Sequence, residues 1–299
     1  MNTERAKNML IALLSVIAVF LGVLIFVIEG RYILTAGQEA AIIAILERDG
    51  IHLRDDVTLV RDFQPMRQMG MRRYSYDLES LAARFFGDED FVKEINPPVY
   101  IFTHPNHDEG MVMQYSSWTN AINFFIPQGI SNEAFAAMLN YRAAEFLAAQ
   151  YVENLIGMPP NMQHYSTTIS HQGYWVIDFF TVYRGFVLHN DHIRARVSKD
   201  GIFRIEYSRV DYYGFVGDSR NIIPPNEALM MLMNHMRSAG AEGTITINDM
   251  RLSYFLTEEG GQSAGVPAYV FAVYMGGQMR WNYIFNAYTN ELLHYETTP

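Results

Sequence analysis

The stretch Ala268-Tyr-Val-Phe-Ala-Val-Tyr-Met275, with Gly276-Gly277 after it and Met279-Arg-Trp-Asn-Tyr-Ile-Phe-Asn286 beyond, is the clearest indicator of the fold class. Both runs are rich in aromatic and β-branched side chains, which suit a pleated, half-buried surface. The two glycines provide the backbone freedom that a tight turn requires. We therefore expect strands over residues 268–275 and 279–286, joined by a turn at the glycines.

Further strands are predicted on both sides of a long helix in the middle of the chain. Their patterns lie at residues 57–63, 99–103, 111–116, 121–126, 163–169, 174–183, 192–198, 202–207, 244–247 and 251–256. Helical spacing of apolar residues predicts helices over residues 35–50, 77–86, 132–156 and 224–238. This order of strands, helix and strands is typical of an α+β protein with antiparallel sheets rather than of alternating βαβ units.

Local signals mark the ends of three of these helices. Thr35 and Gln38 form a capping-box pattern, and Gly50 follows the last turn of the first helix. Gly87 stops the second helix, and Pro224 opens the fourth, where proline is compatible with the first turn. We expect each of these helices to bury its apolar stripe against a sheet.

The end of the long central helix is the predicted domain boundary. Ser131 has the residue type of an N-cap, and a Gly/Pro cluster at residues 157–160 stops the helix over 132–156. The prediction is an N-terminal α+β domain over residues 32–160 and a C-terminal α+β domain over residues 161–299.

Residues 9–28, MLIALLSVIAVFLGVLIFVI, contain no charged side chain. A helix of this length covers roughly the 30 Å hydrocarbon core of a bilayer. We expect an uncleaved single transmembrane helix, because the apolar run is longer than that of a secretory signal and no clear cleavage motif follows it. The leader over residues 1–8 carries Arg5 and Lys7 and is expected to be cytoplasmic, with both domains on the outer side of the cell membrane.

Small residues recur on one face of this apolar segment. Ala12, Ser15, Ala18 and Gly22 follow one another at spacings of three, three and four. Small side chains allow close approach of another transmembrane helix. We predict a partner-binding face here, against the alternative that small residues are simply scattered along the segment.

Composition excludes several classes of function. The net charge is −10 and no basic cluster is present, which disfavours binding to nucleic acid or to anionic lipid. The chain has no cysteine, so disulfides, thiolate metal sites and lipoprotein processing are excluded. Aromatic residues make up 14% of the chain, in agreement with a sheet-rich protein.

Chemical motifs are scarce. His104, His107 and Asp108 form the densest group of metal-ligand types, but a metal site requires three or four convergent ligands, and a polar loop is the favoured interpretation. His189-Asn-Asp-His192 is predicted to be a turn between strands. No G-x-S-x-G, S-x-x-K or H-E-x-x-H motif is present. We therefore assign no catalytic residue, cofactor site or metal site.

Three stretches together resemble the YycI (WalI) family. They are Arg5-Ala-Lys-Asn-Met-Leu-Ile11 at the start of the apolar segment, Leu34-Thr35 to Leu53 after it, and the C-terminal run that includes Pro267-Ala-Tyr-Val-Phe271 and Trp281-Asn-Tyr-Ile-Phe-Asn-Ala-Tyr-Thr-Asn-Glu-Leu292. The last run is also similar to PepSY-type modules. The resemblance implies a single-pass accessory protein of a WalK/WalR (YycG/YycF) two-component system, which binds the sensor histidine kinase together with a YycH-like protein.

The sequence therefore favours a non-enzymatic regulator of a membrane histidine kinase involved in cell-wall control. Two alternatives remain open at this point. One is a membrane-anchored cell-wall hydrolase, which would need a cleft with convergent titratable groups, for example around His104, His107 and Asp108. The other is a PepSY-type module that inhibits a peptidase.

Overall fold

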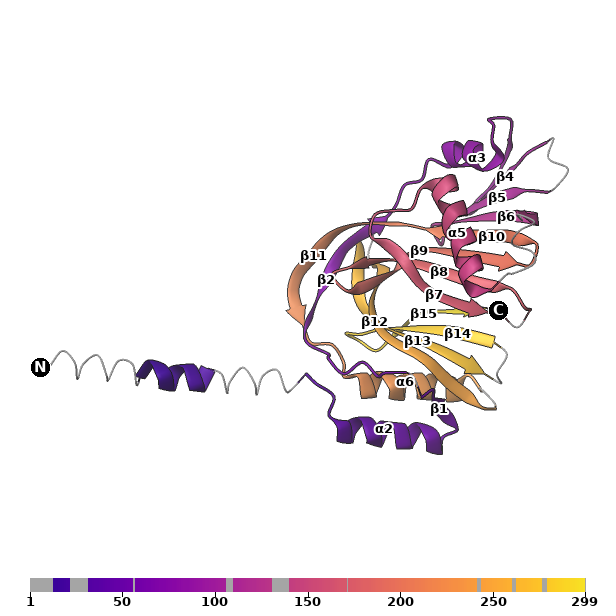
Figure 1. Cartoon of the computed structure of the whole chain (residues 1–299). Helices are drawn as coiled ribbons and strands as arrows, with labels where there is room; N and C mark the ends of the chain where they lie inside the picture. Colours follow the sequence, from indigo (N-terminus) through magenta and orange to yellow (C-terminus); the bar gives the residue numbers. More distant parts are fainter. Residues whose placement is uncertain are drawn as a thin grey trace, which may run out of the picture.

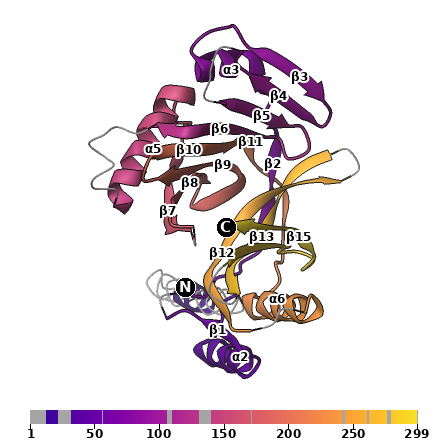
Figure 2. The ribbon, with the colours of Figure 1, turned by 90° about the vertical axis from the view of Figure 1, so that its right-hand side faces the viewer.

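The computed structural model describes residues 13–21, 32–55, 57–105, 110–130, 140–170, 172–240, 243–259, 262–275 and 279–298. Within these ranges the protein is a sheet-rich α+β structure (Figures 1 and 2). The α+β class predicted from the sequence is confirmed.

A single pattern, a helix followed by four strands that pair with their successors as an antiparallel meander, occurs three times. Unit 1 consists of α3 (Leu78–Phe86), β3 (Val92–Asn96), β4 (Val99–Thr103), β5 (Val112–Ser116) and β6 (Ala121–Ile130). Unit 2 consists of α5 (Tyr141–Ile156), β7 (Met162–Ile169), β8 (Trp175–Tyr183), β9 (Phe186–Ser198) and β10 (Gly201–Ser208). Unit 3 consists of α6 (Pro225–Ser238), β12 (Ile245–Glu259), β13 (Gln262–Met275), β14 (Met279–Asn286) and β15 (Leu292–Thr298).

The remaining elements connect these units. They are α2 (Ala36–Arg48), β1 (Ile51–Leu53), β2 (Met66–Arg73) and β11 (Val210–Arg220). Strand β2 pairs with β11 and touches β13, whereas β10 of unit 2 pairs with β6 of unit 1. Strand β12 runs parallel to both β1 and β9. The described strands therefore form one mixed sheet of fifteen strands, and not the two separate antiparallel sheets that the sequence predicted.

Three predicted helices are confirmed together with their ends. The Thr35–Gln38 capping box is formed at the start of α2, and Asp77 caps α3. Gly87 ends α3 with a φ of 86°, in the left-handed region that glycine enters without strain. Helix α6 begins directly after Pro224, as expected.

The central helix begins later than predicted. Asn140 has an extended backbone, and its side chain accepts a hydrogen bond from the Ala143 N–H, so α5 starts at Tyr141 and not at residue 132. The predicted cap Ser131 lies outside the described residues. The prediction had extended the helical spacing of the apolar residues across Asn140, whose side chain competes with the helix for the backbone donors.

Some of the strand predictions are confirmed, and others are wrong. Strands β4 and β14 have the predicted bounds, whereas the predicted strand over 57–63 is irregular, with one isolated bridge from Asp62 to Ile33. Residues 244–247 and 251–256 belong to the single strand β12. The sequence analysis did not predict β2, β3 or β15. The segment 189–192, predicted to be a turn, lies within β9.

Two large hydrophobic cores lie beneath the helices. The first packs α2 and α6 against β2, β12, β13 and β14, and includes Leu46, Met71 and Phe271. The second packs α3 and α5 against strands of units 1 and 2, and includes Phe124 and Ile205. Each core draws residues from both sides of the predicted boundary at 160, so the cores divide the chain differently from the predicted halves.

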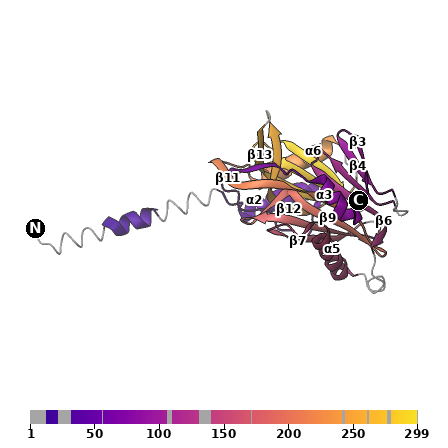
Figure 3. The same cartoon turned by 90° about the horizontal axis from the view of Figure 1, so that it is seen from above.

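Residues 13–21 form a helix that projects away from the folded part (Figures 1 and 3). Ser15 and Ala18 are exposed on this helix, while Ala12 and Gly22 lie outside the described residues. Among the described residues, no helix combines the length and the apolar character that crossing a membrane requires.

Candidate functional site

Strand β9 contains a wide bulge. Phe180 of β8 lies opposite His192, but the next residue, Thr181, lies opposite Leu188. Residues His189, Asn190 and Asp191 therefore have no partner on β8. Bulges re-aim side chains and often lie beside functional sites. At this point β9 also changes neighbours, from β10 over residues 192–198 to β12 over Val187 and Leu188.

The bulge is held by hydrogen bonds to two other strands. The Asn190 side chain accepts a hydrogen bond from the backbone N–H of Leu256 in β12, at 2.7 Å. The Ser208 hydroxyl in β10 donates to the Asn190 carbonyl, at 2.9 Å. Both bonds hold Asn190, the middle residue of the bulge, between β10 and β12.

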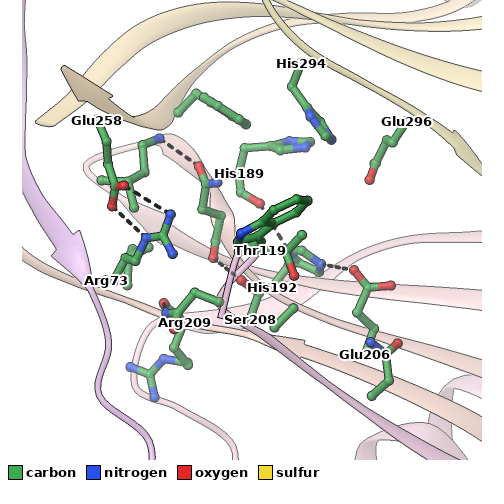
Figure 4. A pocket seen from close by; sticks show the side chains of 18 of the residues that line it. Arg73, Thr119, His189, His192, Glu206, Ser208, Arg209, Glu258, His294 and Glu296 are labelled. Carbon is green, nitrogen blue, oxygen red and sulfur yellow. Dashed lines mark hydrogen bonds and ion pairs between the residues drawn. The ribbon is translucent and has the colours of Figure 1, made fainter. Parts of the chain in front are cut away.

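A cavity of about 430 Å³ lies beside the bulge (Figure 4). Its wall comes from β2 and all three units. The lining residues used below are Arg73 of β2, Trp118 and Asn120 before β6, His189 and His192 of β9, Arg204 and Glu206 of β10, Glu258 of β12, and His294 and Glu296 of β15. A cavity of this size has room for a small organic ligand.

Buried charges surround one end of the cavity. The Arg194 Nε atom lies 2.7 Å from Asp178 Oδ1, and Arg194 Nη2 lies 3.4 Å from Glu296 Oε1. Asn282 donates a further hydrogen bond to Glu296 Oε1, at 2.9 Å. Burial opposes the charge of Arg194, but the two carboxylates raise its pKa well above the usual value. Burial likewise opposes the charge of Glu296, but Arg194 lowers the pKa of this carboxyl group far below its usual value.

His192 and Glu206 form a second charged pair in the same place. His192 Nε2 lies 3.2 Å from Glu206 Oε1, and its Nδ1 lies 3.1 Å from the carbonyl oxygen of His189. Burial would lower the pKa of His192, but Glu206 raises it above the usual value. Burial would raise the pKa of Glu206, but the hydrogen bond from His192 lowers it to about 2.

His189 differs from His192 because no charged side chain of the described residues contacts it. His189 is 5% exposed, and its Nδ1 atom is buried without a hydrogen bond among the described residues. Burial lowers the pKa of His189 to about 3, so the ring is neutral at physiological pH. The ring lies near those of Phe180 and Phe255. The Nδ1 atom of His189 is therefore an unused polar atom that is closed off from solvent.

The rim of the cavity is fixed by contacts between segments that are far apart in the sequence. Arg73 binds Glu258 with two hydrogen bonds of 2.6 and 3.1 Å. Asn120 is 6% exposed and has a φ of 51°, and its side chain bonds Tyr115, Tyr74 and Arg209. These bonds hold the turn that carries Trp118, which is 77% exposed at the cavity.

Arg204 differs from the other arginines of the cavity wall because its hydrogen bonds go to a neutral side chain. Its Nε and Nη2 atoms donate to the side-chain oxygen of Asn123, at 3.1 and 2.7 Å. Within the described parts of the chain, no carboxylate lies at ion-pair distance from Arg204. By contrast, Arg209 Nε lies 3.0 Å from Asp191 Oδ1, although without the alignment of a hydrogen bond.

The sequence analysis also singled out the candidate metal ligands around residue 104 and the small-residue face of the apolar segment. His104 Nε2 lies 3.0 Å from both carboxylate oxygens of Asp88, while His107 and Asp108 lie outside the described residues. No group of three or more metal-ligand residues converges within the described ranges. The small-residue face is represented only by Ser15 and Ala18, which lie on the projecting helix and not at the cavity.

Sequence reasoning missed the cavity because its lining comes from distant strands. The His189–His192 segment had been noticed but was interpreted as a turn. Four polar residues, 189–192, separate Leu188 from the alternating apolar residues Ile193, Ala195 and Val197. Such an interruption fits a bulge within a strand as well as a turn between two strands.

No protein-family model matches the sequence, and no curated protein matches it. The structure is similar to that of an uncharacterized protein from Eubacterium rectale, with a TM-score of 0.50, 12% identity, and coverage of 82% of this chain and 91% of that chain. The C-terminal domain of YpeB from Bacillus megaterium is a further structural neighbour, with a TM-score of 0.37, 13% identity, and coverage of 76% and 99%. The first likeness concerns the fold alone, and the score of the second is too low to support an argument.

Proposed function

We propose that this chain is a non-enzymatic, membrane-tethered accessory regulator of a WalK-type (YycG-type) sensor histidine kinase, acting with a YycH-like partner. The proposal combines the resemblance of the sequence to the YycI family with one structural observation. The N-terminal apolar segment holds the chain in the cell membrane, its leader faces the cytoplasm, and the folded part lies outside.

The observation that carries the proposal is the surface of the projecting helix. Large apolar side chains are exposed over the whole described length of this helix: Leu13, Leu14, Val16, Ile17, Val19, Phe20 and Leu21, between 44% and 67% exposed. Burying such side chains is worth roughly 1.5–3 kcal/mol each. An exposed apolar surface of this kind marks a site of contact with lipid or with another protein.

Contact with the kinase helices uses the face with small residues. Between helices in lipid, association depends on close packing rather than on the hydrophobic effect. Ala12, Ser15, Ala18 and Gly22 allow that approach. A regulator changes kinase output when its helix binds one kinase state more tightly than the other.

Substitution on the two faces of the helix tests the proposal. The full-length chain is co-expressed with the sensor kinase of its own organism and captured from membranes after crosslinking. Ala18→Leu and Gly22→Leu are expected to reduce the captured kinase severalfold. Phe20→Leu is the control. Position 20 lies two residues after Ala18, about 200° further around the helix axis, and leucine keeps the side chain apolar. Capture that is equal for all four proteins contradicts the small-residue interface, and absence of kinase from wild-type captures contradicts the proposed function.

A further inference from the structure

Two carboxylates, Glu206 and Glu296, line one end of the cavity, with side chains 22% and 23% exposed. His192 lies beside Glu206, and Arg194 lies beside Glu296. Glu206 lies close enough to Glu296 for their charges to repel, yet the nearby cations keep both ionised. Because these two negative charges repel each other, this end of the cavity favours a further cationic group.

Unused acceptors point to the kind of cation. Glu206 and Glu296 each use only Oε1 in hydrogen bonds with described residues, which leaves the Oε2 atom of both available. Figure 4 shows Glu206 and Glu296 beside the same space. A primary ammonium group has three donors, which is enough to bond both Oε2 atoms.

The other end of the cavity has the opposite charge. Arg204 has no carboxylate partner among the described residues, and its Nη1 atom makes no hydrogen bond with them. It lies two residues before Glu206 on β10, so both side chains project from the same face of the strand. The two positions are separated by about 7 Å along the strand. A negative group of a ligand fits beside Arg204.

We propose that the cavity binds a small zwitterion, a free amino acid or a dipeptide, with its ammonium group between Glu206 and Glu296 and its carboxylate beside Arg204. The volume of about 430 Å³ suits a molecule of this size. Trp118 lies at the exposed rim, where a bound ligand changes its surroundings. This binding activity goes beyond the proposed regulation of a kinase and does not depend on it.

Ligand chemistry provides the first test and needs no variant. Full-length protein in detergent is titrated by calorimetry with L-alanine, L-alanyl-L-alanine, N-acetyl-L-alanyl-L-alanine and L-alanyl-L-alanine amide. We expect L-alanine or L-alanyl-L-alanine to bind. Whichever of the two binds more tightly shows whether the ligand of the cavity is a free amino acid or a dipeptide. Acetylation removes the positive charge and is expected to weaken dipeptide binding roughly tenfold or more, because buried carboxylates lose their partner. Amidation removes the negative charge and is expected to weaken it less, because Arg204 is more exposed.

Matched variants provide the second test. Glu206→Gln keeps the shape of the side chain and is expected to weaken binding of the tighter ligand roughly tenfold, whereas Glu94→Gln on the exposed strand β3 is expected to leave it unchanged. Absence of binding by both alanine and dialanine overturns the proposal, as does equal affinity for dialanine and its N-acetyl form. Kinase capture by the same preparation reports on the proposed function separately, so either proposal can fail alone.

Discussion

Arg194 and Glu296 are separated by 102 residues in the sequence, yet Arg194 Nη2 lies 3.4 Å from Glu296 Oε1. The side chains are 7% and 23% exposed, so the contact between β9 of unit 2 and β15 of unit 3 includes an ion pair shielded from water. A shielded pair strongly constrains geometry, because each charge depends on the other.

Replacing Arg194 is expected to destabilise the folded part severely. Arg194→Leu leaves Asp178 and Glu296 buried without their cation. Removing one partner of a buried pair costs about 3–5 kcal/mol. Urea unfolding of the purified full-length chain, followed by far-UV circular dichroism, measures the loss of free energy of unfolding.

Arg72→Leu is the matched control for this substitution. Arg72 Nε lies 3.0 Å from Asp211 Oδ2, but these side chains are 71% and 38% exposed. Solvent screens such pairs, so we expect a loss below about 1 kcal/mol. Equal losses for the two variants would show that burial of the Arg194 cluster contributes nothing.

Asn120 is expected to tolerate glycine better than alanine. Its backbone has a φ of 51°, in the region that costs most residues about 1–2 kcal/mol. Both substitutions remove the side-chain bonds to Tyr74, Tyr115 and Arg209, but Asn120→Gly relieves the backbone strain that Asn120→Ala retains. We expect thermal unfolding to rank the proteins as wild type, glycine variant and alanine variant. The reverse order of the two variants would exclude a role for the backbone conformation.

His189 makes stability dependent on pH. Its pKa is lowered to about 3 in the folded protein, from an ordinary value of 6.5. Below pH 6.5 the His189 side chain is therefore protonated in the unfolded chain but stays neutral in the folded protein. The free energy of unfolding consequently decreases as the pH falls. The slope is about 1.4 kcal/mol per pH unit. In His189→Phe this contribution is absent, while the opposite contribution of Asp191, whose pKa burial raises to about 6, remains.

The measurement compares the free energy of unfolding of wild type and His189→Phe between pH 8 and pH 4. Above pH 7 the difference between the two proteins is expected to be constant. Below pH 6.5 it is expected to move in favour of the variant. A difference that is constant down to pH 4 would mean that His189 takes up its proton equally well in both states.

The absence of cysteine allows a clean test of topology. Asp200 is exposed in the turn between β9 and β10, so Asp200→Cys introduces the single thiol of the chain. If the folded part lies outside the cytoplasm, a membrane-impermeant maleimide is expected to label intact cells. Labelling that requires cell lysis would place the folded part in the cytoplasm instead. Wild type, which has no thiol, controls for background.

Local signals predicted much of the framework. The Thr35–Gln38 capping box, the glycine after α3 and the aromatic strand β14 all depend on neighbours within a few residues. Strand β2 was missed because the MRQMGMRR segment has no regular alternation, and its pairing with β11 comes from far along the chain. The segment over 57–63 has the alternation of a strand, but without a partner strand it stays irregular.

The candidate site was less accessible to prediction than the fold. His189 and His192 were noticed, but nothing in their vicinity indicates Glu206, Glu296 or Arg204 as neighbours. These contacts depend on how the three units pack against one another. The local sequence pattern shows which side chains share one face of a strand. It does not show which faces of distant strands come into contact when the units pack.

The composition of the cavity wall has a consequence for the order of folding. Its residues extend from Arg73 to Glu296, so the wall stays incomplete until β15 has joined the sheet. Contacts across such sequence distances form late, because closing long loops costs entropy before the contact compensates for it. A chain released from the ribosome before β15 would keep the core beneath α3 and α5, but it would leave Arg194 without Glu296. Occupancy of the cavity would then distinguish a completed chain from a nearly completed one.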